Sequence, residues 1–329
     1  MDSSIFSRCG LHNIFLIVLS AAWVSGCSSG SSSNMNNEDS PQASVLEGNC
    51  PENFTVQSGG NSGFMSDGKS RQFHIFLPDN LDTPRPLFVS LTGTVATELE
   101  FVSDTISQFE SLADSGWIVV APFRSCTTEN RRCAGIGATG SDDGRFWEPW
   151  FDGWIPQSND EGPDVRFIES MVNCIAADYP VDKERIYNGG SSAGGTMTSR
   201  NMMFNSDLFA GGIIGSGNFQ YLSQFPIQPL DTVAMDSSIV VLLWGGENDR
   251  YGTSDYGIET KLAAEYYAAQ NNVVTVSCSG THGHPWPNAF GPWAAATLLS
   301  HPKGTPVADF ELTTPPEGFS CVLGVYIDH

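Results

Sequence analysis

The stretch YNGGSSAGGTMTS, residues 187–199, contains the pattern G-x-S-x-G in a single register, Gly190 to Gly194. The residues before it, 185–189, fit a short strand, and the residues after it, 196–204, fit a helix. A serine at a tight strand-to-helix turn is typical of a nucleophile elbow, where glycines leave room for a strained backbone. The pattern therefore predicts that Ser192 is a nucleophile.

Main-chain N–H groups beside this turn are expected to stabilise the oxyanion that forms when a carbonyl group is attacked. One is the N–H of Ala193, which follows the serine directly. The second donor of such a site comes from the loop after an earlier strand, and here the apolar run 87–91 leads into Thr94. Ser191 has no glycine two residues after it, so we expect it in the wall around the substrate.

A serine nucleophile needs a base, and few histidines are available. His74 lies on a predicted outer strand and precedes the serine, whereas the order along such chains is serine, acid, histidine. The candidates that follow the serine are His282, His284, His301 and His329. His284 lies in a loop shortly after the apolar run 273–278 and is the predicted base, with His282 as its rival.

The acid that orients the base should follow an intermediate strand. The run 239–244 (IVVLLW) leads directly into GGEND, so Asp249 stands at the carboxyl end of a predicted strand. Glu247, Asp231 and Asp255 remain alternatives. Asp249 is preferred because of its position, since an acidic chain carries many surface carboxylates.

Strand-like apolar runs alternate with helix-periodic runs along the rest of the chain, which is the α/β pattern. The expected class is α/β, with a mostly parallel central sheet and helices on both faces, in one domain from 50 to 329. The expected strands are 71–77, 87–91, 117–121, 239–244 and 273–278, and the expected helices are 99–113, one capped by Asp164, and 259–270.

The first 49 residues are not expected to join that domain. Residues 1–26 combine Arg8 with a short apolar core, as secretory signals do, and VSGC at 24–27 resembles the bacterial lipobox that directs lipidation of Cys27. The polar, serine-rich residues that follow, up to 49, predict a flexible tether. We therefore expect an exported lipoprotein, anchored at the outer membrane or cell surface, periplasm-facing or released.

Charge and cysteine usage exclude other classes. The formal net charge of −22 disfavours nucleic acid as a partner. The cysteines beyond the tether number six, none spaced as zinc ligands are, and an even number in an exported chain favours disulfides. Cys126 and Cys133 are the predicted pair, while the pairing of Cys50, Cys174, Cys278 and Cys321 stays open. We expect no metal.

One motif points elsewhere. Residues 135–140 match G-x-G-x-x-G, but no strand precedes them and no helix follows, so a dinucleotide site is not expected. No cofactor is implied.

The chain resembles the α/β-hydrolase branch that holds polyhydroxybutyrate depolymerase-like esterases and feruloyl and acetylxylan esterases. The resemblance runs from about Arg71 to Pro287 and is densest at five stretches: DVRFI (164–168), YPVD (179–182), GSSAGG (190–195), DLFA (207–210) and GHPWP (283–287). It implies a triad of Ser192, Asp249 and His284 and an oxyanion hole at Thr94 and Ala193. The family commonly has His where this chain has Thr92 and an apolar residue where it has Asn188, so we expect the substrate wall to differ.

These observations together predict a serine carboxylesterase that forms an acyl-enzyme. Aromatic side chains are concentrated in 146–154, and Trp147, Trp150 and Trp154, with Trp286 beside the base, are expected either to line the substrate site or to pack that loop onto the domain. The sequence does not distinguish polyesters, feruloyl or acetyl groups on polysaccharides, and simple aliphatic esters. A serine peptidase and a non-catalytic binding lipoprotein remain alternatives, and the oligomeric state is open.

Overall fold

In a computed structural model of the chain, the residues described are 50–93, 102–103, 108–123, 162–219, 235, 237–251 and 254–325. All of them belong to one compact unit, Ala43–His329. The predicted signal segment, tether and Cys27 lie outside the described residues, as do Cys126 and Cys133.

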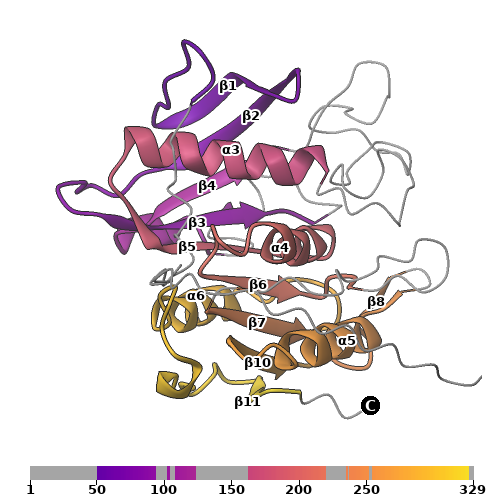
Figure 1. The fold of residues 1–329 in the computed structure, drawn as a ribbon. Helices are drawn as coiled ribbons and strands as arrows, with labels where there is room; N and C mark the ends of the chain where they lie inside the picture. The colour runs from indigo at the N-terminus through magenta and orange to yellow at the C-terminus, as the bar shows by residue number, and fades with distance from the viewer. Residues whose placement is uncertain are drawn as a thin grey trace, which may run out of the picture. The chain divides into compact units, whose positions relative to one another are not determined.

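A nine-stranded sheet forms the centre of the described part of the chain (Figure 1), in the order β1-β2-β4-β3-β5-β6-β7-β10-β11. The six strands from β4 to β10 in that order run parallel, and β1, β2 and β11 pair antiparallel at the two edges. The strands are β1 Gly59–Ser66, β2 Lys69–Phe76, β3 Arg85–Leu91, β4 Ile118–Pro122, β5 Val181–Ser191, β6 Gly211–Gly215, β7 Ser238–Trp244, β10 Val273–Ser279 and β11 Ser320–Leu323. A separate two-stranded ribbon joins β8 Arg250–Tyr251 to β9 Ser254–Asp255.

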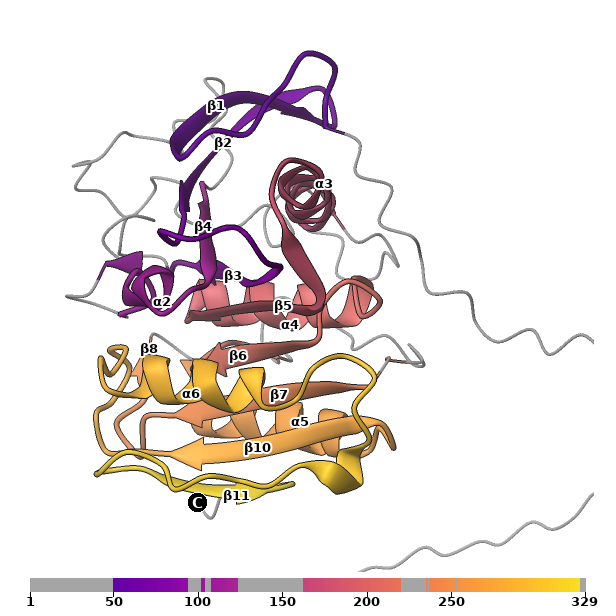
Figure 2. The same ribbon diagram turned by 90° about the vertical axis from the view of Figure 1, so that its left-hand side faces the viewer.

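Helices cover both faces of this sheet, as Figures 1 and 2 show. Two apolar cores result, one shared by α3, α4 and α5 with the sheet, and the other by α2 and α6 with the opposite face. The helices are α2 Ser111–Asp114, α3 Pro163–Asp178, α4 Ala193–Phe204, α5 Tyr256–Ala268, α6 Phe290–Leu299 and the 3-10 turn η2 Val307–Asp309. The predicted α/β class, with helices on both faces of a mostly parallel sheet, is confirmed.

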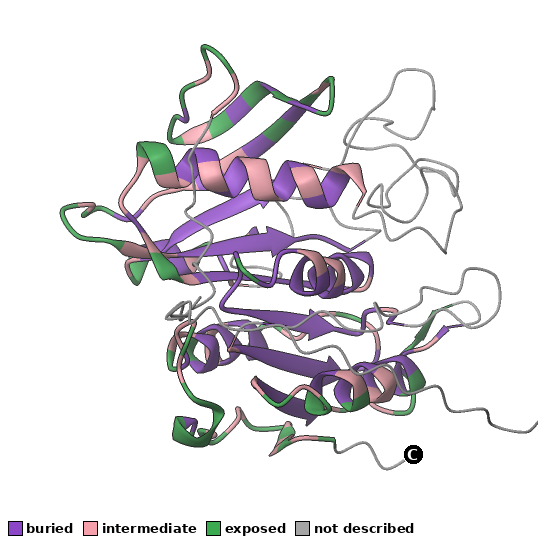
Figure 3. Cartoon of the chain, in the orientation of Figure 1, coloured by how far each residue is buried: buried purple, intermediate pink, exposed green. Residues whose placement is uncertain are grey.

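The predicted strands correspond to β2, β3, β4, β7 and β10, each with bounds within about two residues of those expected. The continuous apolar runs of β3, β4, β7 and β10 are buried because helices pack on both sides (Figure 3). Strand β6, with the sequence GGIIG, gave no such signal because three of its five residues are glycine. It nonetheless lies between β5 and β7.

Two helices differ in detail from those expected, one at its N-terminus and one in its extent. Asp164 does not cap its helix: the N-cap position of α3 is Gly162, and the carboxylate of Asp164, on the second residue of the helix, pairs with buried Arg71 of β2. An ion pair that joins helix to sheet has replaced the cap. In the described part of 99–113, residues 111–113 fall in α2 and Val102 is helical, and Gly116 has the positive φ, 92°, expected of a helix end.

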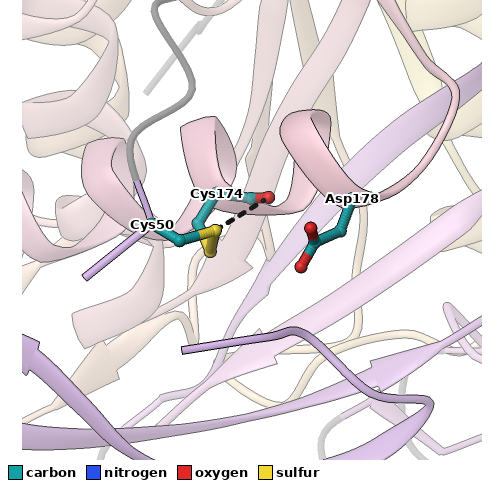
Figure 4. Close-up of side chains that lie close together, drawn as sticks. All are labelled: Cys50, Cys174 and Asp178. Carbon is teal, nitrogen blue, oxygen red and sulfur yellow. Dashed lines mark hydrogen bonds between the residues drawn. A yellow bond between two sulfur atoms is a disulfide. The ribbon is translucent and has the colours of Figure 1, made fainter. Parts of the chain in front are cut away.

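Among the described residues, two disulfides join parts of the domain that are distant in the sequence: Cys50–Cys174, which joins the start of the domain to α3, and Cys278–Cys321, which joins β10 to the edge strand β11. The first lies beside Asp178, one turn further along α3 (Figure 4), and Asp178 accepts a hydrogen bond from the N–H of Val56 at 2.8 Å. Because both sulfur atoms are bonded to each other, this cluster offers no thiolate to a metal. It holds the start of the domain onto α3.

Across the described residues we find no helix with the length and apolar character needed to span a bilayer.

Candidate active site

Ser192 occupies the turn between β5 and α4, with φ 56° and ψ −121°. Few residues other than glycine adopt a positive φ, so this turn is strained, and its geometry explains the glycines around it. A Cβ atom on Gly190 or Gly194 would lie 2.0 or 1.9 Å from the carbonyl oxygen of Leu91. The predicted strand, tight turn and helix are therefore present, and the glycines permit strand β3 to lie against the elbow.

The amide of Ala193 begins α4 immediately after the serine. The carbonyl oxygen of Ser192 accepts the first helical bond, from Thr196 at 3.0 Å, so the amide of Ala193 belongs to the unpaired first turn that favours anions. Thr94 lies outside the described residues. The preceding Gly93 lies against the elbow, since a Cβ atom on it would be 3.4 Å from the Cβ of Ser192.

Asp249 and His284 are joined directly: Nδ1 of His284 lies 2.9 Å from Oδ1 of Asp249. The other carboxylate oxygen, Oδ2, accepts hydrogen bonds from the hydroxyl of Ser216 at 2.6 Å and the N–H of Gly245 at 2.7 Å. The Asp249 side chain is fully buried and that of His284 is 22% exposed. With Nδ1–H donating to the carboxylate, Nε2 of His284 is left as a proton acceptor.

The alternative acids and bases have other partners or lie elsewhere. Glu247 is exposed, and Asp255 caps α5 through the N–H groups of Gly257 and Ile258. His282 packs on Phe319, and burial lowers its pKa. His301 is buried against Phe310. Asp231 and His329 lie outside the described residues.

Two tyrosine rings lie parallel to the imidazole of His284. Tyr256, buried at the start of α5, stacks on it with ring centroids 4.4 Å apart and an interplanar angle of 18°. Tyr251 of β8 lies 6.0 Å away at 25° and is 59% exposed. Stacked rings restrict the plane of the imidazole. The sequence gave no indication of either tyrosine.

Strand β6 links the serine to the acid. The N–H of Ser192 donates to the carbonyl of Gly215 at 2.8 Å, and the next residue, Ser216, donates to Asp249. The ring of Trp286 covers Gly215, on which a Cβ atom would lie 2.4 Å from it. Since β3, β5, β6, β7 and β10 are parallel, all these turns meet at one edge of the sheet, where Figure 1 shows the arrowheads.

The predicted substrate residues are divided between described and undescribed parts. Ser191 ends β5 and is 6% exposed, and Trp286 packs on Phe109 and Phe290. Trp147, Trp150 and Trp154 lie outside the described residues.

A cavity of about 720 Å³ opens beside the turn that carries Asp249, bounded by the loops that follow β7 and β10. Its lining includes Trp244, Glu247, Asn248 and Thr281 but none of Ser192, Asp249 and His284, so it lies beside the triad candidates and not at them.

The two departures from the family pattern are both interior. Thr92 is 1% exposed, and Asn188 is fully buried. The side-chain amide of Asn188 donates to the carbonyl of Gly211 at 3.3 Å and accepts from Asn201 at 3.4 Å. These two side chains are therefore part of the protein interior. Their difference from the family pattern affects interior packing and not a surface that a substrate contacts.

A serine turn and an acid–histidine pair at the carboxyl edge of a mostly parallel sheet define an enzyme of the α/β-hydrolase fold, and comparison with known proteins makes it a serine ester hydrolase. The chain belongs to the family of the oxidized polyvinyl alcohol hydrolases. It is 37% identical to the protein of that name from Sphingopyxis sp. (strain 113P3) over 85% of this chain and 89% of that protein. It is 36% identical to the solved native structure of sOPH, with a TM-score of 0.74, over 85% of this chain and 98% of that one.

No family model matches the chain. Feruloyl esterase B from Thermothelomyces thermophilus is 26% identical over 67% of this chain and 70% of its own length. The predicted esterase branch of the α/β hydrolases is thus confirmed, and the oxidized polyvinyl alcohol hydrolases are a group that the sequence alone did not suggest.

Proposed function

We propose that Ser192, His284 and Asp249 form the catalytic triad of a carboxylic ester hydrolase. His284 removes the proton of the Ser192 hydroxyl through Nε2, and the serine oxygen attacks the ester carbonyl. The N–H groups of Ala193 and Thr94 stabilise the oxyanion. His284 then protonates the leaving alcohol, and water releases the acyl group by the same steps in reverse.

The observation that carries this proposal is the hydrogen-bond pattern of Asp249. One carboxylate oxygen is occupied by two donors, so the other is directed to Nδ1 of His284 at 2.9 Å. That arrangement fixes the tautomer in which Nε2 accepts a proton, and it stabilises the imidazolium that forms. A binding protein would have no need of a buried carboxylate held in this way, which favours catalysis over the non-catalytic alternative.

The relationship to the oxidized polyvinyl alcohol hydrolases indicates a second substrate class, 1,3-diketones. A polymer obtained by oxidising polyvinyl alcohol carries carbonyl groups on a backbone of carbon alone, so hydrolysis that shortens it must break a carbon–carbon bond. With two carbonyl groups flanking one methylene, Ser192 adds to the first, and the bond to the methylene breaks with its electron pair stabilised as the enolate of the second. His284 protonates this enolate, and water hydrolyses the acyl-enzyme. Esters and 1,3-diketones thus need the same residues.

The test is Ser192→Ala against a matched control, Ser199→Ala. Ser199 lies two turns further along α4, is 2% exposed, and its hydroxyl has no hydrogen-bond partner among the described residues. We expect Ser192→Ala to lose hydrolysis of p-nitrophenyl acetate and butyrate and Ser199→Ala to keep it. A folded Ser192→Ala protein with wild-type rates would refute the proposal.

Further measurements separate the alternatives. Parallel assays on p-nitrophenyl esters, a small 1,3-diketone, oxidised polyvinyl alcohol and peptides define the substrate class, and cleavage of peptides alone would favour the peptidase. A fluorophosphonate probe should label Ser192, and no adduct there would favour a binding protein.

We also propose that the chain is exported and lipidated at Cys27. Two disulfides within the domain are typical of an oxidising compartment and support export. Mass spectrometry of the mature N-terminus, with Cys27→Ala as control, tests this. An unmodified N-terminus upstream of Cys27 would refute it.

A further inference from the structure

The last residue of β6 and the two residues after it form a turn in which only one position carries a side chain. They are Gly215, Ser216 and Gly217. A Cβ atom on Gly215 would lie 2.4 Å from the ring of Trp286, and one on Gly217 would lie 2.7 Å from the backbone of Gly195. Neither contact tolerates a side chain, so the turn lies wedged between the start of α4 and Trp286.

Ser216 itself is held in an unusual conformation. Its φ of 45° is rare for a residue with a Cβ atom, and its side chain is 2% exposed. Its N–H donates to the carbonyl of Leu243 on β7 at 2.9 Å, and its hydroxyl donates to Oδ2 of Asp249 at 2.6 Å. Both bonds tie the turn to strand β7 and to the acid that follows it, which offsets the strain.

We propose that Ser216 is a positioning residue that holds Asp249 in the geometry required by His284, a role that rests on the proposed function. The Asp249 carboxylate is buried and can rotate about its terminal torsion unless its oxygens are fixed. Ser216 and the N–H of Gly245 occupy Oδ2 together, which leaves Oδ1 for Nδ1 of His284. Without the hydroxyl, only the N–H of Gly245 holds Oδ2, so the carboxylate stays beside the imidazole but is held less firmly in the orientation that His284 requires.

The same turn also couples the acid to the nucleophile. Gly215 accepts the N–H of Ser192 at 2.8 Å, one residue before the hydroxyl that reaches Asp249. Ser216 thus determines where the acid lies relative to a backbone that also holds the elbow.

Removing the hydroxyl has a consequence for proton transfer as well as for geometry. The hydroxyl disperses part of the carboxylate charge, so its loss leaves a more basic carboxylate beside His284 and favours the imidazolium. The base should therefore be deprotonated only at higher pH. Among the described residues, the titratable groups near His284 also include His282, which interacts with the charge of Asp249, and Tyr251 and Tyr256, whose rings stack on the imidazole; Arg250 is paired with Asp255 at 2.7 Å.

Ser216→Ala and Ser216→Gly test the proposal together. Glycine adopts a positive φ without strain, so Ser216→Gly keeps the backbone conformation of the turn and removes only the side chain. If the turn conformation alone matters, this variant keeps its activity. We expect both variants to lose about 10- to 100-fold in kcat/KM for p-nitrophenyl butyrate, the range expected for one charge-assisted hydrogen bond. We also expect the acid limb of the pH–kcat/KM profile to move to higher pH in both.

Ser277→Ala is the matched control. Ser277 is a fully buried serine on β10, and its hydroxyl donates to the carbonyl of Gly324 at the edge of the sheet. We expect this variant to keep the wild-type pH profile. Wild-type kcat/KM and pH profile in Ser216→Gly would overturn the positioning role. Fluorophosphonate labelling of the Ser216 variants, slower than in wild type but still at Ser192, separates this result from failure of the proposed function, in which no adduct forms in any protein.

Discussion

Replacing Asp249 by asparagine tests the acid–base pair, because the new amide has one acceptor and one donor group where the carboxylate has two acceptors. The position of Oδ2 faces two donors, the hydroxyl of Ser216 and the N–H of Gly245. A hydroxyl can rotate to accept, but a main-chain N–H cannot. An NH₂ group placed there would leave the buried N–H of Gly245 unpaired, at a cost of about 1–3 kcal/mol.

The asparagine oxygen therefore takes the place of Oδ2, and its NH₂ group faces Nδ1 of His284. Nδ1 must then accept, the ring proton moves to Nε2, and His284 can no longer take the proton of Ser192. Loss of the correct tautomer in a triad costs about ten-thousand-fold in kcat, or about 5.5 kcal/mol in activation free energy. We expect a loss of this order for Asp249→Asn with its fold retained.

Initial rates with p-nitrophenyl butyrate across a pH series measure this, with circular dichroism and urea unfolding as controls for folding. Glu247→Gln is the matched variant, since Glu247 is the exposed carboxylate of the same loop and should keep wild-type rates. A folded Asp249→Asn protein with more than about a tenth of the wild-type kcat would refute the tautomer argument.

Three further outcomes are expected. Gly194→Ala should lower kcat/KM about a hundredfold or more, because its Cβ atom would lie 1.9 Å from the carbonyl oxygen of Leu91 and displace the elbow by about 1 Å. Gly60→Ala should not, because its Cβ atom would only reach ordinary van der Waals distance, 3.9 Å from Nδ1 of His74. The double Cys278→Ala, Cys321→Ala protein should lose about 4 kcal/mol of unfolding free energy, as expected for a closed loop with a sequence separation of 43; a loss in urea unfolding below about 1 kcal/mol would contradict this. Burial lowers the pKa of His301 from its ordinary 6.5, so the unfolded chain binds a proton there before the folded one does as pH falls. Wild type should therefore lose more stability than His301→Gln between about pH 7.5 and pH 5.5, and equal losses in urea midpoints would contradict the assignment.

The sequence predicted what periodicity and residue type can encode. Strand β7 is a continuous apolar run, so its position, and that of Asp249 just after it, could be read directly. The cap assigned to Asp164 was wrong because its partner, Arg71, lies 93 residues away along the chain. Long-range pairings of this kind leave no local pattern, and the same holds for Cys278 and Cys321, whose strands become neighbours only when the sheet has formed.

Ser216 and Tyr256 were missed for a related reason. A serine between two glycines reads as ordinary turn composition, and a tyrosine at the start of α5 reads as a core residue. Each gains its role from a contact across strands, at 2.6 Å to Asp249 and 4.4 Å to His284. The sequence held one indication of Ser216: it closely follows the apolar pair Ile213 and Ile214 of β6, at the same edge of the sheet as the predicted acid Asp249.

The choice of substrate has to be sought in exposed side chains beside His284, because the two departures from the family pattern do not face solvent. Thr92 is 1% exposed and Asn188 is fully buried with its amide hydrogen-bonded under α4. Tyr251, in contrast, is 59% exposed while its ring lies 6.0 Å from that of His284. We predict that this exposed ring contacts the group that His284 protonates as it leaves. Substitution of Tyr251 should therefore change the preference between substrates that release an alcohol and substrates that release an enolate more than substitution of Thr92 or Asn188 does.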